Sequence, residues 1–278
     1  TVTGRTRLAE GATSLRMSDL GYQSAAQESI NICFNHLDTY CNTLSNAVHH
    51  PWPTYEGLGL KDDHGFKQLN TAVLQIENEY YSSIRPKRIQ QPGERSVRAL
   101  INRGVEYLEV RAIDLNPFAR NGISEHEASL ITLLMTASAL ADSPLNSTEE
   151  CIAIDGINAR TSWAGRRPEQ RFDDHSTFKQ AGLKFLGSLD PIAEALNTAF
   201  HTESFTGALE HARLRLDGTC LLLSEEIEQA VIQNGHLAFG LARANQHHDS
   251  WQTVSLTPEK LATMQREAQE SLTTEQQM

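Results

Sequence analysis

The sequence predicts an α+β fold in which a sheet-bearing part, residues 1–120, precedes a mainly helical part, residues 121–278. Apolar and polar side chains alternate with a period of two in residues 69–81 and 104–111, as in strands. After residue 124 the apolar side chains recur instead at helical spacing. The 278 residues fit one large domain or two small ones, and they are enough for a hydrophobic core.

The segment 104–111, Gly-Val-Glu-Tyr-Leu-Glu-Val-Arg, carries the most chemistry. As a strand it directs Tyr107, Glu109 and Arg111 to one face and Leu108 and Val110 to the other. Neighbours on one face lie roughly 6.5–7 Å apart, so a carboxylate and a guanidinium stand side by side. That pairing suits a site that holds a metal ion together with an anion, as nucleoside triphosphate chemistry requires. The alternative is an ordinary ion pair on an exposed sheet.

The segment 69–81 is predicted as a second strand. Leu74 and Ile76 would face one way, whereas Glu77, Glu79 and Tyr81 would face the other. The two carboxylates could bind a metal, but a solvated strand face is the simpler interpretation. Tyr81 could equally be a packing residue, since aromatic side chains are common in strands.

Helical spacing and helix-capping residues predict the remaining elements. A first helix is expected over 24–47, ended by the His- and Pro-rich loop 49–53, and a short one over 96–102. Ser124 and Ser147 each precede a Glu by three residues, which is the pattern of a capping box at a helix start. The other helical segments are 125–141, 178–189, 192–200, 226–232 and one from Thr257-Pro258, with a tail, 267–278, expected to fray.

Composition excludes several classes of protein. The net charge of −11 argues against general nucleic-acid binding, although Mg²⁺ and a few local arginines would still permit ATP binding. We find no apolar run long enough to span a membrane and no signal peptide. The four cysteines form neither a CxxC pair nor a disulfide framework, so a reduced, cytoplasmic setting is expected. The chain opens at Thr1 without Met, as expected of a processed product, a fragment or a shifted numbering.

Other polar groups have simpler interpretations. The basic run Arg85, Lys87 and Arg88 could contact a phosphate, but such runs are usually solvated. The pairs His49-His50 and His247-His248 lack a third ligand at metal-binding spacing. Cys33 and Cys41 would lie eight residues apart on the first helix, too far along its axis to form a disulfide, and are expected in the core.

Four ordered motifs carry a resemblance to a known family. They are Ala-Thr-Ser-Leu-Arg-Met-Ser-Asp-Leu-Gly-Tyr at 12–22, Leu-Gln-Ile-Glu-Asn-Glu at 74–79, Ile-Arg-Pro-Lys-Arg at 84–88, and the segment 104–118. Together they resemble the bacterial, gammaproteobacterial-type glutamate–cysteine ligase. The similarity spans essentially the whole chain, but it covers only the C-terminal half or so of the family. The family's N-terminal half, with its acidic strand motif for Mg²⁺, is absent.

The resemblance implies a fold and a reaction. The fold would be part of a glutamine-synthetase-like antiparallel sheet followed by a helical region. The enzyme would join L-glutamate to L-cysteine with ATP, through a γ-glutamyl phosphate, in the first step of glutathione biosynthesis. Mg²⁺, or Mn²⁺ in its place, would neutralise the phosphates. The missing N-terminal half would be a partner, and this chain alone would be inactive.

The resemblance also implies residue roles. Glu109 matches a metal-binding carboxylate, Arg111 an arginine near the transferred phosphate, and Arg16 an arginine that contacts substrate or phosphate. Tyr22 and Tyr81 match aromatic residues that line the cysteine pocket.

The sequence departs from the family in its opening residues, 1–10, and at Gly11, which stands where the family has an aromatic residue. The alternatives are another carboxylate–amine ligase of the same fold and a non-catalytic helical interaction module.

Overall fold

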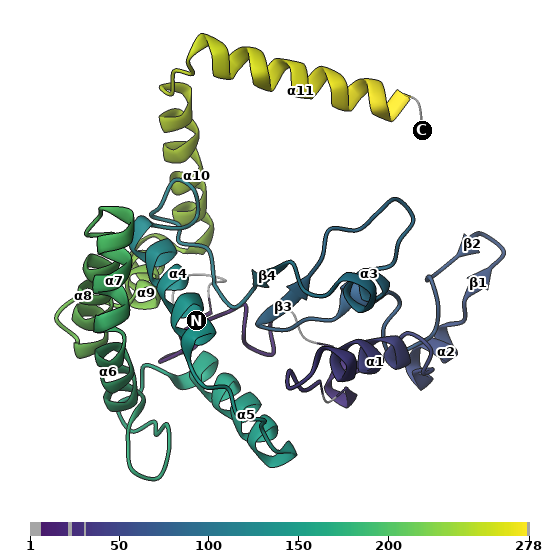
Figure 1. Cartoon of the computed structure of the whole chain (residues 1–278), viewed down its shortest axis with the longest axis horizontal. Helices are drawn as coiled ribbons and strands as arrows, with labels where there is room; N and C mark the ends of the chain where they lie inside the picture. The colour runs from purple at the N-terminus through teal and green to yellow at the C-terminus, as the bar shows by residue number, and fades with distance from the viewer. Residues whose placement is uncertain (1–6, 22–23, 31, 277–278) are drawn as a thin grey trace.

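The computed structural model describes residues 7–21, 24–30 and 32–276. Its elements follow the expected order, with short strands in the first part and helices in the second (Figure 1). The elements of the first part are η1 Gln27–Ser29, α1 Leu37–Ala47, α2 Pro53–Leu58, β1 Lys61–Asp62, β2 Gly65–Phe66, η2 Glu77–Glu79, β3 Ile84–Lys87, α3 Ser96–Arg103 and β4 Tyr107–Val110. The helices of the second part are α4 Glu125–Leu140, α5 Thr148–Ala164, α6 Phe178–Ser188, α7 Asp190–Phe200, α8 Ser204–Asp217, α9 Leu223–Asn234, α10 His236–Gln252 and α11 Pro258–Gln276.

The strands pair antiparallel, β1 with β2 and β3 with β4. The β3–β4 register places Arg85 opposite Glu109 and Lys87 opposite Tyr107. Directly opposed residues share a face, so the basic side chains of β3 lie beside the carboxylate of β4. The α+β class and the strand at 107–110 are therefore confirmed.

A first hydrophobic core lies under α1 and α3 in the sheet-bearing part. Tyr40, Cys41 and Leu44 of α1 pack there with Leu100 of α3 and with Leu74. Leu74 and Cys41 are fully buried, so the core prediction for Cys41 is confirmed. A second core joins α4, α6, α7 and α8 around Leu133, Leu186, Leu189, Ala193, Phe205 and Leu209. The two cores fall on either side of residue 120, where the domain boundary remains a prediction.

Two predictions for the first part are wrong. Residues 69–81 form no regular strand: they run irregularly, with only the isolated Pro51–Ala72 bridge, into the turn η2. Their apolar side chains are buried by α1 rather than by a sheet, because Leu74 packs into the first core. The helix expected over 24–47 begins only at Leu37, and the described residues before it include just the short turn η1. Cys33 is thus not on a helix, and it is half-buried rather than in the core.

Local capping signals located the longer helices well. Ser124 and Ser147 both accept a hydrogen bond from the backbone N–H three residues on, and both boxes are closed by a Glu. The helices beginning at Ser96 and Pro258 are also found, although α11 continues to Gln276 where fraying was expected. Helix α10 was not predicted. Among the described residues no helix is both long and apolar enough to cross a lipid bilayer.

Candidate active site

The paired strands β3 and β4 surround one carboxylate with three cations. The Glu109 Oε2 atom lies 3.8 Å from an Arg85 nitrogen and 3.5 Å from Lys87 Nζ, and Oε1 lies 3.6 Å from Arg111 Nε. The expected same-face pairing of Glu109 and Arg111 is therefore present. Because three positive groups face one negative group, the cluster has a local excess of two positive charges, which favours an anion nearby.

One oxygen of this carboxylate accepts no hydrogen bond among the described residues. Glu109 Oε2 is buried, and its charge is balanced by ion pairs with Lys87 at 3.5 Å and Arg85 at 3.8 Å. A hard carboxylate oxygen is also a ligand that Mg²⁺ accepts. Glu109 thus fits a metal ion chemically. No group of three possible metal ligands occurs among the described residues, so the remaining ligands of such a site would come from elsewhere.

Arg16, Arg111 and Tyr81 converge although they are far apart in sequence. Arg16 Nε donates a 2.5 Å hydrogen bond to the Arg111 carbonyl oxygen. The Arg111 guanidinium lies 5.3 Å from the centre of the Tyr81 ring, within range of a cation–π interaction. Arg111 is also anchored by its backbone N–H, which donates to the Ser83 carbonyl at 2.8 Å. The structure therefore brings three of the five expected site residues together.

A turn bound by Asp114 positions Arg16. The Asp114 carboxylate accepts from the Arg16 backbone N–H at 3.0 Å and from the Ser14 hydroxyl. Ser14 Oγ in turn accepts from the Met17 backbone N–H at 3.1 Å. Because Asp114 lies shortly after the end of β4, this network links the Arg16 turn to the segment that carries Glu109 and Arg111.

The segment before Arg16 lies against the end of α5. The Thr13 backbone N–H donates to the Ser162 carbonyl at 2.9 Å, and Arg166 Nε donates to the Ala12 carbonyl at 2.8 Å. Gly11 has a φ of +79°, and a Cβ there would lie 2.7 Å from Arg167 Cγ. Arg167 thus occupies the space beside the position where the family has an aromatic residue.

A pocket of about 570 Å³ lies between these arginines and α5. Arg16, Tyr81 and Arg111 line it, whereas Glu109 adjoins Arg111 without lining the pocket itself. Helix α5 also lines the pocket and contributes Asp155, whose pKa burial raises above its usual range. The pocket lining thus includes both guanidinium groups and carboxylates, the second carboxylate being Glu28. Tyr22 lies outside the described residues.

Buried groups beneath the cluster keep it dry on one side. Arg85 is only 6% exposed, and its guanidinium donates to the Asn78 carbonyl at 2.5 Å and to the Tyr80 carbonyl. Burial, and then the nearby Arg111, lower the pKa of Arg85. Burial also raises the pKa of Tyr40 to about 12, and it raises the pKa of Tyr80 as well. Charges act more strongly in such surroundings than in water.

Two site features were not anticipated from the sequence. Arg85 looked like part of a solvated basic run, but it is buried, and only the strand register pairs it with Glu109. Asp155 carried no local signal, because its place in the same pocket as Arg16 depends on the packing of α5.

The acidic pair of the 74–79 motif has a structural role rather than a solvated one. Glu77 accepts from the Ser96 hydroxyl at 3.1 Å and pairs with Arg95 Nε at 3.0 Å, which stabilises the start of α3. Glu79 Oε2 accepts from the Gln75 backbone N–H at 2.5 Å. Both interpretations of this pair, as metal ligands and as a solvated strand face, are therefore replaced by local capping.

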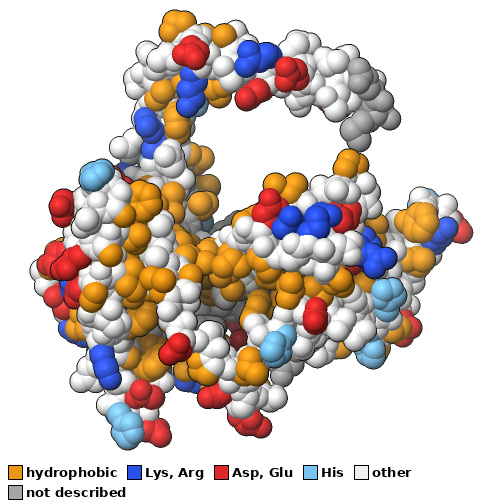
Figure 2. Space-filling model, in the orientation of Figure 1, with side chains coloured by type: hydrophobic (Ala, Val, Ile, Leu, Met, Phe, Trp, Pro, Cys, Tyr) orange, Lys and Arg blue, Asp and Glu red, His pale blue; other side chains and the backbone are white. Residues whose placement is uncertain are grey.

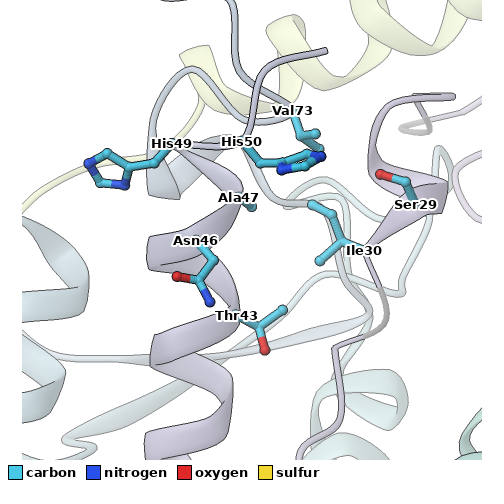
Figure 3. Close-up of a pocket in the computed structure, with 8 residues that line it drawn as sticks. All are labelled: Ser29, Ile30, Thr43, Asn46, Ala47, His49, His50 and Val73. Atoms are coloured by element: carbon cyan, nitrogen blue, oxygen red, sulfur yellow. The ribbon is translucent and has the colours of Figure 1, made fainter.

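Among the described residues, neither histidine pair belongs to a group of three possible metal ligands. His49 and His50 line a second pocket, of about 490 Å³, but their side chains point in different directions (Figure 3). His49 Nδ1 contacts the Ser45 carbonyl at 2.7 Å, and His247 Nε2 contacts the Pro117 carbonyl at 2.8 Å. These contacts satisfy ordinary structural roles.

Comparisons with known proteins define the class. The family model of glutamate–cysteine ligase matches residues 1–160. The chain is 38% identical over 269 residues to a glutamate–cysteine ligase of Hahella chejuensis, covering 94% of this chain and 51% of that protein. It is 40% identical over 266 residues to the enzyme of Pseudomonas aeruginosa strain UCBPP-PA14, covering 94% of this chain and 50% of that protein.

A solved structure agrees with the sequence comparisons. The glutamate–cysteine ligase of Francisella tularensis in complex with AMP superposes with a TM-score of 0.87 at 30% identity, over 96% of this chain and 54% of that one. The chain therefore belongs to the glutamate–cysteine ligase family. It spans about half the length of the curated relatives it matches.

Proposed function

We propose that this chain is the C-terminal part of a glutamate–cysteine ligase. The complete enzyme would act in the cytoplasm, without a nucleic-acid or membrane partner, and join L-glutamate to L-cysteine with ATP through a γ-glutamyl phosphate. The observation that supports this most directly is the convergence of Arg16, Arg111 and Tyr81 on one pocket beside the Glu109 cluster. Family membership supplies the reaction class.

The two arginines are proposed to hold the anions of the reaction. A guanidinium binds carboxylate or phosphate oxygens in bidentate fashion, and its charge does not titrate near neutral pH. Arg111 is pre-oriented by Glu109 and by the Tyr81 ring, so it would contact the transferred phosphate without further ordering. Arg16, hydrogen-bonded to the backbone of Arg111, would contact substrate or phosphate beside it.

Glu109 is proposed as a metal ligand that this chain supplies. Its carboxylate, of which Oε2 accepts no hydrogen bond among the described residues, would bind the ion. A bound Mg²⁺, or Mn²⁺ in its place, would supply neutralisation of phosphate charge.

Asp155 is proposed to bind the amino group of an amino-acid substrate. It lines the same pocket as Arg16 and Arg111, so the pocket offers both cations and a carboxylate. A free α-amino acid carries both charges and would find a partner for each. Tyr81, and Tyr22 by family resemblance, would form the aromatic wall around the cysteine side chain.

The N-terminal half of the enzyme is proposed to cover β4. Leu108 and Val110, expected as the apolar back of the strand, are 46% and 37% exposed within this chain. Hydrophobic side chains also gather on the face between the β3–β4 pair and the helical part (Figure 2). An exposed strand with apolar side chains is costly unless a partner packs on it.

A joining experiment tests the proposal. The purified chain alone is compared with the same chain fused behind the N-terminal half of the Pseudomonas aeruginosa relative, with γ-glutamylcysteine and ADP measured. We expect product from the fusion and none from the chain alone. Product at a normal rate from the chain alone would contradict a shared site. Preference for 2-aminobutyrate or another amine over cysteine would indicate a different carboxylate–amine ligase, and a fusion without ADP formation would favour a non-catalytic module.

A further inference from the structure

Two thiols from distant parts of the sequence meet at the edge of the pocket. Cys33 Sγ and Cys151 Sγ lie 3.1 Å apart, although 118 residues separate them. Both cysteines are half-buried, so small reagents can reach them. The other two are unlike them, since Cys41 is fully buried and Cys220 is exposed.

The thiol contact fastens two walls of the candidate active site. Ile32 and Phe34, on either side of Cys33, line the pocket, and so does Ile152, next to Cys151 in the first turn of α5. Asn35 and Asn146 form a second link beside the first. The Asn35 side chain donates to the Asn146 carbonyl at 2.8 Å, and its Oδ1 accepts from the Asn146 backbone N–H at 3.0 Å.

We propose that Cys33 and Cys151 form a reversible disulfide site that locks α5 onto the segment 32–35 at the pocket wall. A disulfide needs the sulfur atoms at about 2.05 Å, so they must approach by about 1 Å. The amide links of Asn35 already hold the two backbones in place, which reduces the search for that geometry.

The oxidant is a low-molecular-weight disulfide, RSSR. One cysteine thiolate attacks a sulfur of RSSR, forming a mixed disulfide and releasing RS⁻. The second cysteine thiolate then attacks the protein sulfur of that mixed disulfide and releases the second RS⁻. The protein loses two protons and two electrons, RSSR gains two electrons, and the two RS⁻ take up the protons as RSH.

The hydrogen bond with Cys33 raises the pKa of the Cys151 thiol. Because the thiolate is the reactive form, this slows attack by Cys151 near neutral pH.

Oxidation of the purified, reduced protein with 2-hydroxyethyl disulfide, a linear low-molecular-weight disulfide, tests the site. We expect a mass loss of about 2 Da, for two hydrogens, and one Cys33–Cys151 cross-linked peptide that disappears on reduction. Cys33→Ser and Cys151→Ser should each abolish it, whereas Cys220→Ser should keep it. The two serine variants lie in different segments, so a folding defect in one of them would not explain loss of the cross-link in both. An unchanged mass, or cross-links to Cys220 instead, would overturn the proposal.

Thermal unfolding and amide exchange test the lock itself. Closing a loop of 118 residues should raise the Tm of the oxidised wild type on the order of 10 °C. Amide exchange in the first turn of α5 should slow severalfold. Oxidised Cys33→Ser should show neither effect. Equal shifts in the wild type and Cys33→Ser would contradict the lock. None of these measurements uses the ligase reaction, so they test the disulfide site independently of the proposed function.

Discussion

Replacing Arg85 with leucine removes the donor that ties the turn η2 to β3. The Arg85 side chain is 7% exposed. It donates hydrogen bonds to the carbonyls of Asn78 and Tyr80 and forms an ion pair with the carboxylate of Glu109. Leaving the half-buried Tyr80 carbonyl without a donor costs about 1–3 kcal/mol. Losing one of three cations around the partly exposed Glu109 adds about 1 kcal/mol. Asn78 is exposed, so water can replace the guanidinium there.

The expected loss in the free energy of unfolding is therefore about 2–4 kcal/mol, a large fraction of a typical total. Urea denaturation followed by tryptophan fluorescence and far-ultraviolet circular dichroism measures it. The matched control is Arg98→Leu, an exposed position on α3, which should change stability by less than about 0.5 kcal/mol. A loss in the free energy of unfolding no larger than that of the control would refute the claim that the buried Arg85 holds the turn η2 to β3.

Three further predictions concern other parts of the chain. Burial, then Arg215 and His126, lower the pKa of His211 in α8, so the unfolded chain binds the proton more readily. The contribution of His211 to the free energy of unfolding is therefore complete above about pH 6.5 and is lost as the pH falls through the folded-state pKa. The difference between the urea midpoints at pH 7.5 and pH 5.5 should be smaller in His211→Gln than in the wild type. Ser124→Ala removes a capping box and should cost about 1 kcal/mol in the same urea assay, and no measurable loss would contradict that role. In the fused enzyme, Asp155→Asn should raise the amino-acid KM more than it lowers kcat, and unchanged kinetics would remove Asp155 from the substrate site.

Features that depend on neighbouring residues could be predicted from the sequence. The helices after Ser124 and Ser147 are specified by side chains that cap the backbone three residues away. The facing of Glu109 and Arg111 follows from the period of a strand. The failed strand at 69–81 has an instructive cause. Its alternation is real, but Leu74 is buried against a helix, and periodicity does not reveal which element covers an apolar side chain.

Features that depend on tertiary packing could not be predicted. Arg85 becomes buried only through the β3–β4 register, and a basic run gives no sign of that. The contact between Cys33 and Cys151 spans 118 residues and involves a segment expected to be helical. Arg16 and Arg111 could be named from family motifs, but their shared position depends on Asp114, which has no distinctive pattern of its own.

The most direct test of the central claim is the turnover of Glu109→Gln in the fused enzyme, compared with Glu106→Gln. Glu106 lies just before the same strand and pairs with Arg88, away from the pocket. Glutamine keeps the shape of Glu109 but removes the charge that would bind metal and orient Arg111. We expect kcat to fall by orders of magnitude, at least about 10²–10³-fold, while Glu106→Gln stays near wild type. Equal turnover in both variants would contradict the assignment of Glu109 to the active site.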